Sequence, residues 1–176
     1  MAIKRSFPPI IRSDARILVL GSMPGEESLR KRQYYAHKQN KFWRFLCDAA
    51  DLPFDIDYDE KIREMQKRRV ALWDVLKQCE RRGSLDSNIV KNSEEANDIA
   101  ELLQDFKGIT RIVFNGQKSF SAFKKHILKE NSHLLEYDLV ILPSTSPANA
   151  SIKLDVQRES WLTNVWKYFD PGSRFK

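Results

Sequence analysis

The segment Ile17-Leu18-Val19-Leu20-Gly21-Ser22-Met23-Pro24-Gly25 decides the fold of this chain. Its first four residues form a short apolar run, and the glycines that follow allow the backbone to turn tightly. A polar, basic segment then leads to Tyr34-Tyr35-Ala36-His37-Lys38-Gln39-Asn40-Lys41-Phe42-Trp43. This pattern predicts a buried strand, a glycine turn, a surface loop and the start of a helix. Open α/β sheets bind ligands at the carboxyl ends of their strands, so we expect the functional site on this turn and loop.

Three further apolar runs have the length and the flanking turn signals of buried strands. Together with the first run they predict strands at Arg16–Gly21, Arg69–Val75, Thr110–Asn115 and Leu139–Pro143. Segments of helical spacing alternate with these runs, at Asn40–Leu52, Tyr58–Arg68, Ser93–Phe106, Lys118–Lys129 and Val156–Phe169. The hydroxyl of Ser93 is a candidate cap for the third helix. Strands that alternate with helices favour a parallel sheet covered on both faces.

The composition is that of an ordinary globular protein, with 41% hydrophobic and 31% charged residues in 176. We expect a single domain over residues 1–176, with its core at about 14–169 and a frayed basic tail at 170–176. No apolar run approaches the ~20 residues of a membrane span, and the N-terminus lacks the apolar core of a secretory signal. These features predict a cytoplasmic protein, and we expect it to be a monomer.

Charge and cysteine content narrow the function only slightly. The chain carries 30 Lys and Arg against 24 Asp and Glu, and its net charge of +6 is a modest indication of an acidic partner such as nucleic acid. Cys47 and Cys79 lie far apart and lack the spacing of metal ligands. We therefore expect two buried free thiols and neither a metal site nor a disulfide.

Small or polar residues end each predicted strand. Gly21-Ser22, Asp74, Asn115-Gly116 and Ser144-Thr145-Ser146 occupy these positions. Because the carboxyl ends of parallel strands meet at one edge of the sheet, these residues are expected to form a single site there.

Tyr35, His37 and Asn40 lie in the polar loop that borders this site. A tyrosine ring in a pocket can stack on a nucleic acid base, which is typically worth ~1–3 kcal/mol. Asn40 either caps the helix that follows or acts in catalysis, and the residues alone leave both open. His37 can donate to a base or a phosphate, but we expect it to hold the backbone of its own loop.

Two loops contain candidate phosphate ligands. The hydroxyls and backbone amides of Ser144-Thr145-Ser146-Pro147-Ala148-Asn149 suit a phosphate, although they also suit a turn with local hydroxyl–backbone bonds. Arg81-Arg82-Gly83-Ser84 is a basic loop beside the predicted site, or else a solvated surface.

Taken together, these segments resemble the uracil-DNA glycosylase superfamily, most closely its hypoxanthine-DNA glycosylase (deoxyinosine glycosylase) branch. The resemblance spans roughly Arg16 to Asn149, in the order that the family uses. It rests on Leu20-Gly21-Ser22-Met23-Pro24-Gly25, Tyr34-Tyr35-Ala36-His37 with Asn40 and Phe42-Trp43, Ala71-Leu72-Trp73-Asp74-Val75-Leu76, Gly83-Ser84-Leu85-Asp86-Ser87, Phe114-Asn115-Gly116, and Ser144-Thr145-Ser146-Pro147-Ala148-Asn149.

The resemblance implies a three-layer α/β/α sandwich around a four-stranded parallel sheet. It implies an enzyme of base-excision repair that flips a deaminated base, most notably hypoxanthine, out of DNA and hydrolyses its N-glycosidic bond. Such an enzyme needs no metal or other cofactor, and its partner is DNA that carries the lesion, which places it with the nucleoid.

The resemblance also assigns roles to residues. Asn40 is the implied catalytic residue, since the water-orienting asparagine that mismatch-specific uracil glycosylases have in the first motif is replaced here by Met23. Asp74 is placed to accept the N1–H of hypoxanthine, although a carboxylate that caps Ser84 or Ser87 is an equal alternative. The expected substrate-binding residues are Gly21, Ser22, Met23, Pro24, Gly25, Tyr35, His37, Asp74, Asn115 and Ser144. The expected phosphate ligands are Ser144, Thr145, Ser146, Arg81 and Arg82.

The last motif also departs from the wider superfamily. Uracil glycosylases place a histidine and then a leucine wedge in this motif, at positions that match Ser144 and Ala148. Two alternatives remain: a uracil or mismatch glycosylase of the same fold, and a non-catalytic module that binds damaged or single-stranded DNA. The residue that wedges into the helix is not determined by the sequence, and Arg81, Arg82 and the Ala148 loop are all candidates.

Overall fold

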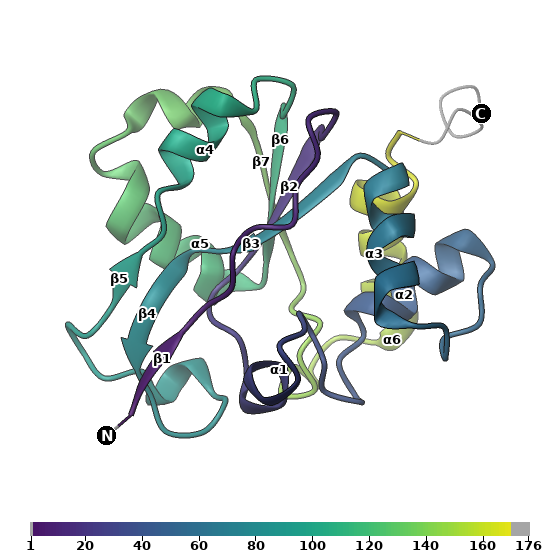
Figure 1. Cartoon of the computed structure of the whole chain (residues 1–176), viewed down its shortest axis with the longest axis horizontal. Helices are drawn as coiled ribbons and strands as arrows, with labels where there is room; N and C mark the ends of the chain where they lie inside the picture. The colour runs from purple at the N-terminus through teal and green to yellow at the C-terminus, as the bar shows by residue number, and fades with distance from the viewer. Residues whose placement is uncertain (1, 170–176) are drawn as a thin grey trace.

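A computed structural model describes residues 2–169, and the predicted frayed tail at 170–176 lies outside the described residues (Figure 1). At its centre lies a four-stranded parallel sheet in the order β3-β2-β6-β7. The strands are β2 (Ile17–Gly21), β3 (Val70–Asp74), β6 (Arg111–Asn115) and β7 (Asp138–Leu142). The four predicted strands and their parallel pairing are thereby confirmed.

Helices cover both faces of this sheet, as Figure 1 shows. One face carries α2 (Phe42–Ala50), α3 (Tyr58–Lys67) and α6 (Leu154–Trp161), and the other carries α4 (Ile99–Asp105) and α5 (Gln117–Phe123). Two of the helices, α5 and α6, continue as wider π-type turns at Lys124–Leu128 and Leu162–Trp166. The three-layer α/β/α sandwich is therefore confirmed.

The alternation of side chains along β2 explains why both faces are covered. Leu18 and Leu20 pack into the core beneath α4 and α5, whereas Ile17 and Val19 pack into the core beneath α2 and α6. Successive side chains of a strand point to opposite faces, and all four are completely buried. A strand of this kind is stable only between two helical layers.

A second sheet was not predicted. It is small and antiparallel, in the order β1-β4-β5, and consists of β1 (Ile3–Arg5), β4 (Leu76–Glu80) and β5 (Glu95–Ala96). Only Val75 separates the end of β3 from the start of β4, so β4 carries the chain from the central sheet to the Arg81 loop. A short helix, α1 (Glu26–Lys31), lies where the sequence predicted a loop. Two 3-10 turns occupy Asp86–Asn88 and Ser132–Glu136.

The predicted start of the third helix at Ser93 is wrong. The Ser93 hydroxyl donates to the Val90 carbonyl at 2.6 Å and accepts the Glu80 N–H at 3.0 Å. The residues after it pair with β4, and α4 is capped by Asp98, whose carboxylate accepts the Glu101 N–H at 3.1 Å. Pairing with a strand from elsewhere in the chain overrides the local helical pattern.

Two smaller expectations can also be compared with the structure. Cys47 and Cys79 are buried free thiols, as predicted. Within residues 2–169, no helix is both long enough and apolar enough to cross a membrane.

Candidate active site

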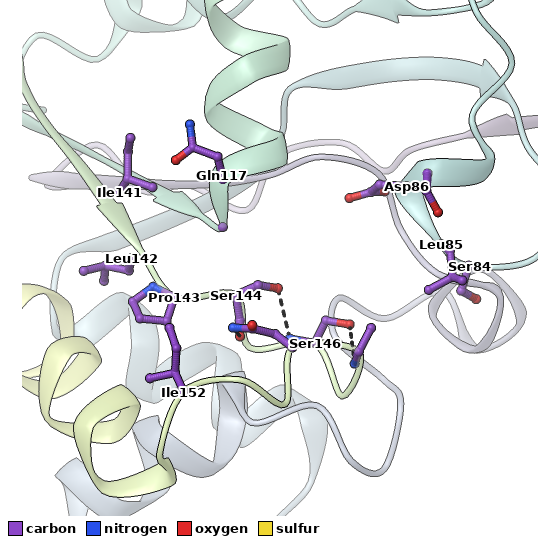
Figure 2. A pocket seen from close by; sticks show the side chains of 14 residues that line it. Ser84, Leu85, Asp86, Gln117, Ile141, Leu142, Pro143, Ser144, Ser146 and Ile152 are labelled. Carbon is purple, nitrogen blue, oxygen red and sulfur yellow. Dashed lines mark hydrogen bonds between the residues drawn. The ribbon is translucent and has the colours of Figure 1, made fainter.

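The residues at the ends of the four parallel strands surround one cavity of about 270 Å³. Gly21 from β2, Asp74 from β3, Asn115 from β6 and Ser144 after β7 all line it. So do Asn40 and every other residue that the sequence placed in contact with substrate. A wider groove of about 580 Å³ adjoins the cavity and shares part of its wall (Figure 2).

The floor of the cavity is crowded and polar. Asp74 is only 3% exposed, and neither its Oδ2 nor the hydroxyl of Tyr35 has a hydrogen-bond partner among the described residues. A Cβ on Gly21 would lie 2.5 Å from Asp74 Oδ1 and 2.8 Å from the Tyr35 hydroxyl. Only glycine leaves room for both side chains, so the first glycine of the opening segment is needed for close approach.

Burial strongly affects the ionisation of these groups. Loss of hydration and, to a smaller extent, the charge of Asp86 raise the pKa of Asp74 to about 7, and Arg81 opposes the shift. Burial also raises the pKa of Tyr35, assisted by the charge of Asp74. The Tyr35 hydroxyl therefore stays protonated and can donate a hydrogen bond, whereas Asp74 changes charge near neutral pH.

The Tyr35 side chain lines the cavity and packs against an aromatic residue of α2. It stacks on Phe42 with ring centroids 4.2 Å apart and an interplanar angle of 30°. Its backbone has φ of +53°, a left-handed conformation that is uncommon for a tyrosine and fixes the course of the loop. Stacking of the ring on a flipped base stays a prediction.

Asn40 contributes to the start of α2. Its side-chain Oδ1 accepts the Phe42 N–H at 3.0 Å, and its own N–H donates to the His37 carbonyl at 2.9 Å. The N-cap of α2 is Lys41, so Asn40 stabilises the helix start from the position before the cap, and this contact does not exclude catalysis. An amide oxygen has two lone pairs, and the Asn40 amide nitrogen has no hydrogen bond to another described residue, so both groups can still serve a ligand in the cavity.

His37 holds its own loop, as expected. Its Nδ1 accepts the Gln39 N–H at 3.1 Å, and the ring is otherwise exposed at the cavity rim. A contact of His37 with substrate stays a prediction.

Asn115 and Thr145 form a closed pair of hydrogen bonds. The Asn115 amide donates to the Thr145 hydroxyl at 2.9 Å, and its Oδ1 accepts the Thr145 N–H at 2.9 Å. Thr145 is 0% exposed, and its carbonyl accepts the Lys41 N–H. These contacts favour a structural role for Thr145, and its predicted contact with a phosphate stays a prediction.

Ser144 and Ser146 remain suited to a phosphate. Both are partly exposed and line both cavities. Their hydroxyl oxygens accept backbone N–H groups, Ser144 from Ser146 at 3.2 Å and Ser146 from Ala148 at 3.3 Å (Figure 2). Each hydroxyl hydrogen stays available to donate to an anionic oxygen.

The two adjacent arginines have different environments. Arg81 is 1% exposed; its guanidinium donates to the carbonyls of Gly83 and Pro24 and lies 3.5 Å from Asp86. The protein interior encloses this charge, so the structure favours a structural role for Arg81, and its predicted contact with phosphate stays a prediction. Arg82 is exposed, so its predicted contact with phosphate is compatible with the structure.

Asp86 was not among the predicted site residues, although the motif that contains it was. It accepts the Ser22 hydroxyl at 2.6 Å, pairs with Arg81 and lines both cavities. Burial raises the pKa of Asp86, whereas Ser22 and Arg81 lower it. Within residues 2–169 no cluster of three His, Cys, Asp or Glu side chains is arranged to hold a metal ion.

The contrast between the arginines can be tested with a matched pair of variants. Arg81→Ala leaves Asp86 and two carbonyls without their buried partner, and we expect it to lower the free energy of unfolding by ~3–5 kcal/mol. Arg82→Ala should change stability by less than ~0.5 kcal/mol and reduce the salt dependence of DNA binding by about one phosphate contact. Urea unfolding and binding titrations at several salt concentrations measure these effects. Equal stability losses would contradict the assignment of Arg81.

Three comparisons place the chain among known proteins. The family model of the Uracil DNA glycosylase superfamily matches residues 8–170. The chain is 36% identical over 170 residues to a protein of Methanosarcina acetivorans named hypoxanthine DNA glycosylase, covering 94% of this chain and 99% of the relative. A Methanosarcina barkeri protein of the same name is 36% identical over 160 residues, covering 90% and 95%.

The same fold occurs in a solved structure. A solution NMR structure from Methanosarcina acetivorans, named as a uracil DNA glycosylase, superposes with a TM-score of 0.76 at 33% identity. The match covers 94% of this chain and 98% of the other.

Proposed function

This chain belongs to the uracil-DNA glycosylase superfamily, and we propose that it is a DNA N-glycosylase that releases hypoxanthine from deoxyinosine in DNA. The family and the fold that the sequence motifs indicated are confirmed. Two relatives that are similar over nearly their whole length carry the name of this activity. Its partner would be DNA that contains a deaminated base. The protein would act as a monomer, in the cytoplasm and associated with the nucleoid.

The observation that carries this proposal is the unsatisfied polar floor of the cavity. A buried carboxylate oxygen and a buried phenol hydroxyl without partners each cost free energy in the unliganded protein. A ligand that presents both a donor and an acceptor would remove that cost. The Watson–Crick edge of hypoxanthine does so, with N1–H as donor and O6 as acceptor.

The base would be read at this floor. Ionised Asp74 accepts the N1–H of hypoxanthine, and the protonated Tyr35 hydroxyl supplies a donor beside it. Adenine presents a lone pair at N1 instead, which faces the carboxylate unfavourably. Discrimination by a buried hydrogen-bonding group is strong, because the wrong base leaves that group without a partner.

The bond cleavage itself would occur at the mouth, near Asn40. The enzyme first extrudes the nucleotide from the stack, which costs a few kcal/mol. The bond between C1′ and N9 then breaks, the oxygen of a water bonds to C1′, and the base leaves with a proton. An amide is a poor base, so Asn40 acts by orienting the water and by placing its carbonyl dipole near the cationic sugar. Ser144, Ser146 and Arg82 would hold the flanking phosphates.

A panel of end-labelled oligonucleotides tests this proposal. Each carries hypoxanthine, uracil, xanthine or adenine at one position, in single strands and in duplexes, and abasic sites are cleaved with alkali afterwards. We expect strand breaks mainly at hypoxanthine. A preference for uracil would show that the protein is a uracil or mismatch glycosylase of the same fold. Binding without any cleavage would identify a non-catalytic DNA-binding module.

A further inference from the structure

The structure contains an exposed leucine at the junction of the two cavities. Leu85 is 51% exposed and lines both the base cavity and the adjoining groove. An exposed leucine alone needs no explanation. This one lies on the rim of the cavity into which a base would turn, and Figure 2 shows it beside Ser84 and Asp86, across the groove from Ser144 and Ser146.

The loop around Leu85 is held firmly on both sides. The Ser84 hydroxyl accepts the Glu26 N–H at 2.8 Å, and Asp86 accepts the Ser22 hydroxyl at 2.6 Å. The Leu85 carbonyl itself accepts the Asn88 N–H at 3.0 Å. Both flanking residues are thus tied to the glycine turn and to α1, so the backbone of Leu85 is held in place while its apolar side chain stays half exposed.

The opposite rim of the base cavity carries only smaller exposed side chains, since the exposed residues Ile141 and Ile152 line the adjoining groove but not this cavity. There the exposed residues Pro147 and Ala148 form the edge of the base cavity, and Ala148 presents only a methyl group. Of the candidates in the sequence, Arg81 is enclosed by the protein and is therefore excluded. Among the residues that line both cavities, Leu85 combines the greatest apolar bulk at the rim with high exposure.

We propose that Leu85 is the wedge that enters the base stack and fills the space left by the extruded nucleotide. Apolar side chains inserted between base steps separate the bases and hold the duplex open. A rigid loop suits this role, because little conformational entropy is then lost on insertion. The inference rests on the proposed function: Leu85 acts as a positioning residue and takes no part in breaking the glycosidic bond.

The test compares duplex with single-stranded substrate. In Leu85→Ala, the ratio of the single-turnover rate on duplex hypoxanthine to that on a single strand should fall about 10-fold to 100-fold, since only the duplex must be kept open. Leu85→Met keeps the apolar bulk and should restore most of the ratio. Leu135→Ala is the matched control, because Leu135 is 61% exposed but lines neither cavity.

A bulky partner in the DNA provides an independent check. A pyrene nucleoside opposite hypoxanthine fills the helix itself, so it should raise the duplex rate of Leu85→Ala much more than that of the wild type. A ratio that is unchanged in Leu85→Ala, or equal losses on both substrates without rescue by pyrene, would overturn the wedge.

The failure of the wedge can be distinguished from failure of the proposed function. A 2-aminopurine placed beside the lesion fluoresces when it is unstacked, whether or not the base is cut. We expect a fluorescence rise on binding of wild-type protein and a much smaller rise with Leu85→Ala. If the wild type cuts no base but produces this rise through Leu85, the wedge stands and the proposed glycosylase activity is wrong. The same rise in both proteins would refute the wedge.

Discussion

Replacement of Asn40 by alanine is expected to slow the release of hypoxanthine by at least about 100-fold, the usual effect of removing one polar group that stabilises a developing charge. The physical reason is that Asn40 is a neutral polar group that lines the cavity, with one lone pair of Oδ1 and its amide hydrogens still available. Single-turnover cleavage, with enzyme in excess over labelled duplex, measures this effect directly.

Alanine also removes the hydrogen bond to the Phe42 N–H, which should cost about 1 kcal/mol of stability. Asn40→Ser separates the two effects, because a serine hydroxyl can accept the same N–H but lacks the amide. We expect Asn40→Ser to unfold at nearly the urea concentration of the wild type and yet to lose activity as Asn40→Ala does. If the serine variant retains activity within a few-fold of the wild type, Asn40 is only a cap.

Replacement of Asp74 by asparagine is expected to reduce the rate on hypoxanthine by about 10-fold to 100-fold, the usual effect of a lost hydrogen bond to a charged group. Asparagine can present a donor to the lone pair at N1 of adenine, so the preference for hypoxanthine over adenine should also fall. Competition by free hypoxanthine and free adenine for the cavity measures this preference separately from catalysis. An unchanged preference would remove Asp74 as the group that reads the base.

The pH dependence provides a second readout for Asp74. Its pKa of about 7 means that the carboxylate which accepts N1–H becomes available only as the pH rises through that value, so wild-type activity should increase from pH 6 to pH 8.

The free energy of unfolding should change in the opposite direction. The native pKa is raised above its unfolded value, so the stabilisation from Asp74 is fully present below about pH 4 and is lost as the pH rises through about 7.

Asp74→Asn should flatten both curves over this range. Activity that rises equally in the variant would assign the pH dependence to another group, with Asp86 the nearest candidate because it contacts Ser22 in the same wall.

The parts of the fold predictable from sequence are those where a whole segment is buried. Each of the four central strands is a run of apolar residues between turn signals, and the structure begins and ends each strand within one residue of the prediction. Short apolar runs between turn signals favour buried strands, and helices between consecutive strands favour parallel pairing. The position of the site at the carboxyl edge follows from this topology.

The individual polar residues were less predictable. Arg81 and Arg82 are adjacent and chemically identical, yet one is enclosed and the other exposed. Arg81 donates a hydrogen bond to the carbonyl of Pro24 and forms an ion pair with the carboxylate of Asp86. Pro24 lies 57 residues away in the chain. Thr145 is similar, because its burial depends on Asn115 at the end of a different strand. The residues adjacent in sequence to Arg81 and Thr145 do not indicate these distant partners.

The sequence by itself determined the four strands of the central sheet, their parallel pairing, the edge that carries the cavity and the family, whereas the order of the strands came from the structure. The pattern of apolar residues is a local property that can be read directly from the sequence, and it indicates which segments are buried. Only the tertiary structure decided which polar side chains of that edge face a ligand and which hold the walls together. That choice depends on hydrogen bonds between loops far apart in sequence, which brought Asp74 and Tyr35 together beneath Gly21 and left Leu85 fixed at the rim.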